Sequence, residues 1–383
     1  MKQKAYTLED FDCLMGPEKI YCTTINPVFE EKNVAIAIVS SDEYCPFAAV
    51  VIASIIANAT SENNYDIVVL SNDMLRRNVW RIEKMAEGHD NVSVRVLDIS
   101  KMIQGFTFYT WAHFTPNTYY RLLTPDVFEN YNKVIYLDSD TVVNHDIAEL
   151  YHTDVEGYYL GCAYDTHVVS YCTRKPPLEQ REYNVKTLKM KNPEEYFQAG
   201  VSIFNVKKIR EDFEPGYLLK QGMENKLRWL DQDLVNMLFH GHIKRVPNKW
   251  NVMVSNIPDE LDEYHLPEDL RREYFEARMD PYIVHYVGSS MPCATLTPDL
   301  YEYFWKYARM TAFYEVLLQR MSIHGATKLL HNVIYEAQMG YLRMTPTFKN
   351  RRSRMILKMF PYGSKRREFV KKIYYGFRKL LGK

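Results

Sequence analysis

The sequence predicts an α/β protein built around a mostly parallel β-sheet. Short apolar segments rich in β-branched residues alternate with helix-like segments along the first part of the chain, and the strand segments are apolar on both faces. With 383 residues, of which 46% are hydrophobic and 25% charged, the chain can build a sizeable core.

The expected elements follow one another in order. Strands are predicted at residues 33–40, 65–71, 91–98, 133–138, 158–164 and 200–205, and helices at 47–58, 74–86, 206–223 and 232–239. Residues 165–195 contain two adjacent prolines and many charges, which predict a surface loop or insertion. From residue 298 to about 342 the pattern becomes helical.

This pattern predicts three regions. Residues 1–32 lack periodicity and form an N-terminal extension, residues 33–297 form the main domain, and residues 298–383 form a C-terminal helical region. The start of the chain has no apolar segment of the signal-peptide type, and the most apolar stretch is too short to span a bilayer. The six scattered cysteines, without a CxxC pair, are typical of reduced thiols in a cytosolic protein.

The most specific local feature is the triplet Asp138-Ser139-Asp140, directly after the apolar segment VIYL. Side chains at i and i+2 of a strand point to one side, so the two carboxylates can converge. Two hard oxygen donors suit Mg²⁺ or Mn²⁺ holding a diphosphate. The alternative is a solvated turn, and the position at a strand's carboxyl end, where such sheets bind ligands, puts both interpretations on an equal footing.

Two further segments also allow both a structural and a functional interpretation. His285, in IVHYVG, would favour Mn²⁺ over Mg²⁺ beside two carboxylates, although on its own it is better explained as a buried histidine with satisfied hydrogen bonds. Asp231 follows the apolar RWL and opens a predicted helix, where it could serve as the N-cap. The functional alternative places Asp231 and Gln232 in the ligand cleft.

Two weaker signals come from small and aromatic residues near strand ends. In FQAGV, the small residues Ala199 and Gly200 would let a ligand approach the backbone. After the first predicted strand, SSDEY begins at Ser40, and its Asp42 and Tyr44 could hydrogen-bond and stack on a base.

In this order, YRL, YLDSD, AYD, FQAGV, DQD and HYVG resemble retaining glycosyltransferase family 8, which includes bacterial lipopolysaccharide galactosyl- and glucosyltransferases and glycogenin. The resemblance covers about residues 34–292, roughly two thirds of the chain. It implies a GT-A type fold, in which a Rossmann-like nucleotide half is fused to an acceptor half.

The resemblance also implies roles for individual residues. Asp138, Asp140 and His285 are similar to the ligands of Mn²⁺ (or Mg²⁺), which bridges the phosphates of UDP and neutralises the leaving group. Asp42 and Tyr44 would hold the uracil. The other donor-binding residues would be Ser40, Arg121, Ser139, Gln198, Ala199, Gly200 and Gly288, while Asp165, Asp231 and Gln232 would act on the transferred sugar.

The chain departs from the family pattern at two places. Gln198 stands where the family usually has Asn, which puts the choice of hexose in doubt. Met291 and Cys293 replace a Lys that usually meets the diphosphate and a Trp. Because a charged contact contributes about 1.5–3 kcal/mol, we expect weaker donor binding unless another group supplies it. Gly288 is retained and could act as a hinge for a closing loop.

The resemblance therefore predicts an Mn²⁺-dependent retaining hexosyltransferase. It would move glucose or galactose from a UDP-sugar to a glycan or lipid-linked saccharide, in the synthesis of bacterial lipopolysaccharide, capsule or another surface glycan. Gln232 is a poor nucleophile, which favours a front-face mechanism in which the acceptor attacks from the side that UDP leaves. The alternatives are a glycogenin-like self-glycosylating protein, suggested by the 30 tyrosines, and a catalytically weakened sugar-nucleotide-binding protein, suggested by Gln198 and Met291.

The formal net charge of zero hides a basic tail. Residues 341–383 carry 14 lysines and arginines and one acid, Glu368, which is a net charge of +13 against −13 for the remainder. Apolar and aromatic residues are interleaved with these charges. A solvated or disordered tail is one interpretation; binding to anionic lipid headgroups is the other, and a nucleic-acid partner is not expected. We expect a cytoplasmic protein attached peripherally to the inner face of the plasma membrane.

Overall fold

The computed structural model describes residues 25–112, 114–174, 179–254, 265–288, 291–293, 299–323, 364–366 and 369. The chain divides into two compact units, Met1–Ser322 and Ile323–Lys383, and nearly all described residues belong to the first. Most of the predicted N-terminal extension and of the basic tail therefore lies outside the described residues.

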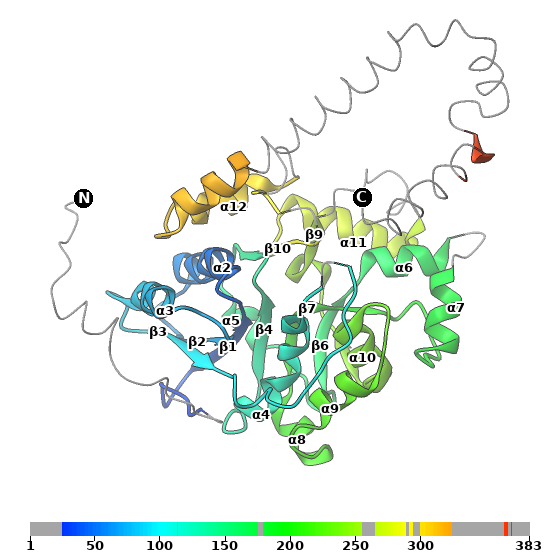
Figure 1. Cartoon of the computed structure of the whole chain (residues 1–383), viewed down its shortest axis with the longest axis horizontal. Helices are drawn as coiled ribbons and strands as arrows, with labels where there is room; N and C mark the ends of the chain where they lie inside the picture. Colours follow the sequence, from blue (N-terminus) through cyan, green and yellow to red (C-terminus); the bar gives the residue numbers. More distant parts are fainter. Residues whose placement is uncertain are drawn as a thin grey trace, which may run out of the picture. The chain divides into compact units, whose positions relative to one another are not determined.

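A seven-stranded sheet in the order β3-β2-β1-β4-β7-β6-β8 forms the centre of the first unit (Figure 1). Its strands are β1 (Asn33–Val39), β2 (Asn64–Ser71), β3 (Val92–Asp98), β4 (Val134–Asp138), β6 (Leu160–Tyr164), β7 (Phe197–Phe204) and β8 (Ile243–Arg245). Only β7 runs antiparallel to its neighbours, β4 and β6, while the remaining pairs are parallel. This arrangement confirms the predicted mostly parallel mixed sheet.

The apolar character of the strands follows from burial on both faces. In β1, Ala35 and Ala37 face one apolar cluster, whereas Ile36 and Ile38 face the other. Helices provide both covers, and Figure 1 places α2 and α3 beside β1–β3 and the group α8–α10 near β6 and β7. The helices are α2 (Cys45–Asn58), α3 (Arg76–Glu83), α4 (Thr124–Val127), α5 (Ala148–Tyr151), α6 (Thr166–Thr173), α7 (Glu179–Lys186), α8 (Val206–Asp212), α9 (Tyr217–Glu224), α10 (Leu230–Leu238), α11 (Glu268–Met279) and α12 (Tyr301–Ala308), with 3₁₀ turns η1 (Lys84–Ala86), η2 (Pro116–Leu123) and η3 (Asn248–Trp250).

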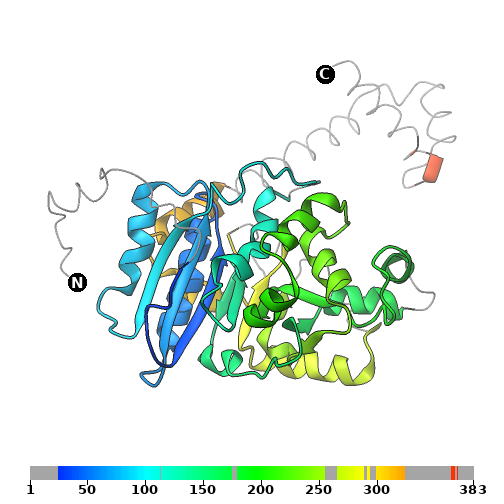
Figure 2. The ribbon, with the colours of Figure 1, turned by 90° about the horizontal axis from the view of Figure 1, so that it is seen from below.

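A second, three-stranded sheet was not predicted. It has the order β5-β10-β9, formed by β5 (Thr141–Val143), β10 (Ile283–Tyr286) and β9 (Val252–Val254). Strand β10 is antiparallel to β5, and His285 pairs with Thr141. Because β5 follows Asp140 directly, this pairing brings residues far apart in the sequence together. Figure 2 shows the first unit from a perpendicular direction.

Three sequence predictions are wrong in detail. Within residues 165–195, the described parts form the helices α6 and α7 rather than a loop, and they bury polar groups; Asn184, for example, is fully buried and donates to the carbonyl of Pro193. The predicted helix 206–223 is two helices, α8 and α9, separated by a turn at Gly216, whose φ is +75°. Strand β7 begins at Phe197, so FQAGV lies within the strand rather than before it.

The helical pattern after residue 298 is confirmed as far as the structure describes it. Helix α12 packs on α2, where Asn58 Nδ2 donates to the Tyr307 hydroxyl at 2.9 Å, and residues 314–323 are also helical. Among the described helices, none combines the length and apolarity needed to cross a bilayer. The four described cysteines are buried and unpaired.

Candidate functional site

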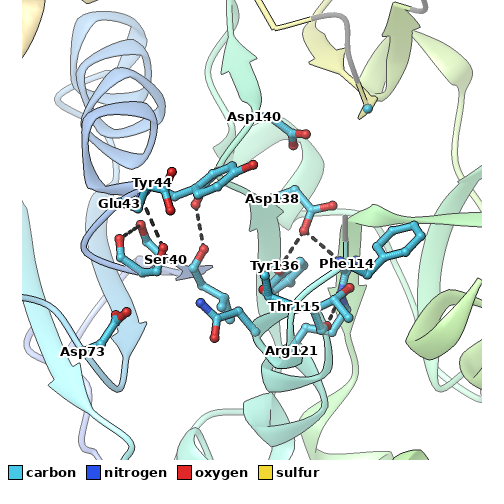
Figure 3. Close-up of a pocket in the computed structure, with 16 residues that line it drawn as sticks. Ser40, Glu43, Tyr44, Asp73, Phe114, Thr115, Arg121, Tyr136, Asp138 and Asp140 are labelled. Atoms are coloured by element: carbon cyan, nitrogen blue, oxygen red, sulfur yellow. Dashed lines mark hydrogen bonds and ion pairs between the residues drawn. The ribbon is translucent and has the colours of Figure 1, made fainter. Parts of the chain in front are cut away.

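A cleft opens beyond the carboxyl ends of β1 and β4, two neighbouring parallel strands. Their last residues, Val39 and Asp138, pair with each other, so the following loops start side by side. The cleft has a volume of about 440 Å³, within the range that holds small-molecule ligands. Figure 3 shows its lining: Val39, Ser40, Ser41, Glu43, Tyr44, Asp73, Phe114, Thr115, Asn117, Thr118, Arg121, Tyr136, Asp138, Ser139, Asp140 and Gly288.

Asp138 presents its two carboxylate oxygens to different partners. Its Oδ1 accepts hydrogen bonds from the Tyr136 hydroxyl at 2.8 Å and from Arg121 Nη2 at 2.9 Å (Figure 3). Tyr136 can reach it because residues two apart on a strand point to the same side. The other oxygen, Oδ2, remains available on the side of His285.

The turn after β4 is fixed by hydrogen bonds from both neighbouring elements. Ser139 points back into the sheet and donates its buried hydroxyl to the carbonyl of Val39 at 2.6 Å. The amide of Tyr286 donates to the carbonyl of Asp140 at 2.9 Å, which ties β10 to the turn. Asp138 and Asp140 are thereby held beside the preceding residue of β10, His285.

His285 completes a cluster of three potential metal ligands. Its Nε2 lies 3.1 Å from Asp140 Oδ1 and 3.7 Å from Asp138 Oδ2, and one ligand atom from each residue falls within 4.8 Å of the others. The imidazole is buried. Burial alone would lower the pKa of His285, but the charges of Asp140 and Asp138 raise it above its usual value.

The cluster fits a divalent cation by three criteria. Oδ1 of Asp140 is buried and accepts no well-directed hydrogen bond within the part of the chain that the structure describes, an arrangement that a positive charge would stabilise. Two carboxylates and an imidazole are suitable ligands for such an ion. Gly200 leaves the space open, because a Cβ there would lie 2.3 Å from His285 Cε1 and 2.4 Å from Asp138 Oδ2.

Arg121 joins this cluster to the opposite wall of the cleft. Besides Asp138, its guanidinium pairs through Nε with Asp231 Oδ2 at 2.7 Å and lies 4.8 Å from the centre of the Tyr136 ring. Although burial opposes it, the two carboxylates raise the pKa of Arg121 further above its ordinary value. Asp231 is not the N-cap of α10 but its second residue, and its Oδ1 accepts from the Thr118 hydroxyl at 2.6 Å. Burial raises the pKa of Asp231 to about 6, against the effect of Arg121.

Gln232 is held at both ends of its amide. Its Oε1 accepts from the amide of Ala199 at 3.1 Å, and its Nε2 donates to Asp165 Oδ2 at 3.0 Å. The other oxygen of Asp165 caps α6 by accepting from Val168 N. Three of the residues that the sequence associates with the transferred sugar or the donor, Asp165, Ala199 and Gln232, therefore form one hydrogen-bonded group. They lie outside the cleft lining.

Gln198 is not part of the cleft lining either. Its Oε1 accepts from Gly200 N at 2.6 Å and from Asn251 Nδ2 at 2.7 Å. Gln198 is 7% exposed and Asn251 only 1%. The sequence linked Gln198 to the sugar, whereas the structure places its amide in a buried network that leads to His285.

The residues after β1 separate into two groups. Ser40 and Tyr44 line the cleft, and Tyr44 is 48% exposed. The carboxylate of Asp42, in contrast, accepts from Leu75 N at 2.8 Å and Asn78 Nδ2 at 2.7 Å, and so connects this loop to the start of α3. Two acids line the cleft at this end: Glu43 of the same loop, and Asp73, which follows β2 and accepts from Asp42 N at 3.0 Å.

The two residues that depart from the family pattern near residue 291 belong to the apolar core. Met291 and Cys293 are both buried in an apolar cluster with Phe47 and Phe304. Burial raises the pKa of the Cys293 thiol to about 11. Gly288 lines the cleft with a φ of +63°, a conformation that glycine adopts readily.

Several lining residues were missed by the sequence analysis: Asp73, Phe114, Thr115, Asn117, Thr118 and Tyr136. Tyr136 could have been found, because it lies two residues before Asp138 in the same strand and must point to the same side. The others come from loops and turns in which side-chain direction has no period.

The comparisons with known proteins agree with this architecture. The model of glycosyl transferase family 8 matches residues 35–292. A putative glycosyltransferase of Haemophilus influenzae is 28% identical over 56% of this chain and 62% of its own length. The glycosyltransferase GlyF of Streptococcus pneumoniae is 27% identical over 61% of this chain and 52% of its own length. The chain thus spans between half and two thirds of these relatives.

Solved structures show the same fold. The apo structure of the bifunctional glycosyltransferase WbbM is 32% identical, with a TM-score of 0.69, covering 78% of this chain and 53% of that one. The galactosyltransferase LgtC, solved with donor and acceptor sugar analogues, is 24% identical with a TM-score of 0.59, covering 73% of this chain and 96% of that one. The mixed sheet is that of GT-A glycosyltransferases, and with a family model matching two thirds of its length, the chain belongs to glycosyltransferase family 8.

Proposed function

We propose that the chain is an Mn²⁺-dependent, retaining hexosyltransferase that takes glucose or galactose from a UDP-sugar. The observation that carries this proposal is the cluster of Asp138, Asp140 and His285 at the carboxyl edge of the sheet, beside a cleft of about 440 Å³. A cation held there would neutralise the negative charge that develops on the diphosphate as it leaves. The imidazole in the ligand set favours Mn²⁺ over Mg²⁺.

The nucleotide would lie along the loops after β1 and β2. Ser40 and Tyr44 line this part of the cleft, and the exposed ring of Tyr44 offers a face on which a base can stack. Asp73 supplies a carboxylate at the same end, able to accept from a base or ribose. Asp42 would support this end indirectly, because its carboxylate is committed to Leu75 and Asn78.

The transferred sugar would lie against Arg121, Asp231 and Gln232. Arg121 and Asp231 are fixed by their ion pair at 2.7 Å, and Gln232 by the amide of Ala199 and the carboxylate of Asp165. Such rigid polar groups position a reacting sugar without reorganising during the reaction. Because an amide is a poor nucleophile, we propose front-face attack by the acceptor hydroxyl, with a phosphate oxygen of the leaving group accepting its proton.

The acceptor would be a glycan or lipid-linked saccharide of the bacterial surface. A relative that is 24% identical over 66% of this chain is named as a lipopolysaccharide 1,2-glucosyltransferase of Escherichia coli. The net charge of +13 in residues 341–383 would hold the enzyme at an anionic membrane surface, close to such an acceptor. The protein would then act at the inner face of the plasma membrane.

A panel of UDP-sugars tests the proposal. The purified chain is incubated with each sugar nucleotide in Mn²⁺, and UDP release is measured with and without EDTA. We expect release from UDP-glucose or UDP-galactose that stops in EDTA. Release that is unaffected by EDTA, or no release and no binding of any UDP-sugar, would refute it.

A further inference from the structure

We propose that Gln198 and Asn251 are positioning residues that fix the tautomer and direction of His285, so that the lone pair of Nε2 faces the carboxylates of Asp138 and Asp140. The proposal rests on the cation site proposed above. It assigns Gln198 a role at the metal side of the cleft rather than at the sugar.

A backbone hydrogen bond fixes the orientation of the Gln198 amide. The backbone N–H of Gly200 points at the side chain of Gln198, 2.6 Å from the atom assigned as Oε1. A backbone amide can only donate, so the atom that faces it must be the amide oxygen rather than the nitrogen. The orientation of the Gln198 amide is therefore fixed by its own strand, β7.

The orientation of Gln198 in turn fixes the orientation of the Asn251 amide. The same oxygen of Gln198 lies 2.7 Å from the amide of Asn251. Because an oxygen without hydrogen can only accept, Asn251 must present its Nδ2 to Gln198. Its Oδ1 then necessarily points the other way.

The orientation of Asn251 determines which nitrogen of the His285 imidazole carries the proton. Oδ1 of Asn251 lies 3.0 Å from Nδ1 of His285, and an amide oxygen at this distance requires a proton on Nδ1. In the neutral ring the proton is then absent from Nε2, which lies 3.1 Å from Asp140 Oδ1 without a well-directed hydrogen bond between them. An unprotonated nitrogen and a carboxylate oxygen this close repel each other, and a cation bound by both removes the repulsion.

Burial keeps the three side chains in these positions. Gln198, Asn251 and His285 are 7%, 1% and 1% exposed, so water cannot replace the missing partner if one of them turns. The ring also lies close to β7 at Gly200, where even an added Cβ would come within 2.3 Å of its Cε1.

The alternative tautomer shows what the network prevents. With the proton on Nε2, His285 would have no lone pair for a metal at that atom. Metal-bound histidines generally donate their other ring N–H to an acceptor, and loss of that acceptor typically lowers metal affinity 10- to 100-fold.

The test compares three variants by two measurements. Asn251→Leu removes the acceptor, and Gln198→Met removes the group that orients Asn251. Asn184→Leu is the control, because Asn184 is as deeply buried but bonds to Gln180 and Pro193 instead. Imidazole ¹⁵N chemical shifts, measured above the pKa of His285 without metal, report the tautomer, and electron paramagnetic resonance reports Mn²⁺ affinity.

In the wild type and in Asn184→Leu we expect ¹⁵N chemical shifts that show His285 protonated at Nδ1 and unprotonated at Nε2. Asn251→Leu should shift the tautomer equilibrium toward the form protonated at Nε2 and weaken Mn²⁺ binding about 10- to 100-fold. Gln198→Met should have a smaller effect in the same direction.

Two outcomes would overturn the proposal. The first is an Nε2–H tautomer in the wild type. The second is an unchanged tautomer and Mn²⁺ affinity in both Asn251→Leu and Gln198→Met. A wild type with the expected tautomer that takes up no Mn²⁺ would instead refute the cation site itself, so the two failures can be told apart.

Discussion

Arg121 Nη2 donates to Asp138 at 2.9 Å through one carboxylate oxygen, and the other oxygen of Asp138 is left facing His285. Asp138 therefore belongs to both halves of the cleft. Its Oδ1 is part of a buried ion-pair network with Arg121 and Asp231, while its Oδ2 is part of the candidate cation site. The stability of the fold and the proposed metal binding are linked through this carboxylate.

Arg121→Met should lower the free energy of unfolding by about 3–5 kcal/mol, because it leaves Asp138 and the buried Asp231 without their shared cation. Urea denaturation in EDTA measures this. Arg210→Met is the matched control, since Arg210 also pairs with two acids, Asp126 and Glu129, but is 27% exposed. The control should lose at most about 1 kcal/mol. An equal loss in both variants would contradict the prediction.

Asp231 should give the folded protein a distinctive pH dependence. In the folded state its pKa is raised from 3.8 to about 6, so between these values the folded chain holds a proton that the unfolded chain releases. The contribution of Asp231 to the free energy of unfolding should therefore decrease as the pH rises from about 4 to about 7.

The comparison with Asp231→Asn isolates this contribution, because asparagine does not titrate. The difference in free energy of unfolding between wild type and variant should fall over that pH range. A difference that is constant, or that grows with pH, would show that the pKa of Asp231 is not raised.

Gln232→Ala should slow transfer by about 100-fold but leave measurable turnover. The substitution frees Ala199 N and Asp165 and so loosens the sugar side of the cleft, without removing a nucleophile. Single-turnover kinetics measure the effect, with Gln221→Ala on α9 as the control. If the folded variant lost every trace of transfer, a covalent role for residue 232 would have to replace front-face attack.

Removal of the basic tail should separate membrane binding from catalysis. A chain ending at Met344 loses most of the 14 basic residues of the tail, and should stay active on a soluble acceptor while no longer floating with anionic liposomes. Equal flotation with and without these residues rules the membrane role out.

The fold was largely predictable because its strands are buried on both faces and produce continuous apolar runs. VIYL before Asp138 is such a run, and its end marks both the strand boundary and the edge where the cleft lies. The helices within residues 165–195 were missed because two prolines and many charges suggested a loop, whereas polar side chains there, such as Asn184, are satisfied by partners within the fold. Periodicity does not carry that information.

The cluster at the strand ends was predictable, whereas the rest of the cleft was predicted only in part. Asp138, Asp140 and His285 are brought together by β4, β5 and β10 as the sequence suggested. Asp42 was predicted to face the base, yet its carboxylate binds the start of α3, and Asp73 lines the cleft instead. Asn251 lies just after η3, in a segment without a pattern that could have indicated its contact with His285.

Calorimetric titration of UDP into the wild type and Asp140→Asn, each with and without Mn²⁺, tests the proposed cation site most directly. Asp154→Asn, a substitution at a distant exposed turn, serves as the control. We predict that UDP binding by the wild type and the control requires Mn²⁺, and that Asp140→Asn weakens Mn²⁺-dependent binding by about 100-fold or more, since loss of a direct ligand should exceed that of a supporting group. UDP binding of equal strength in EDTA, or unchanged binding in Asp140→Asn, would contradict it.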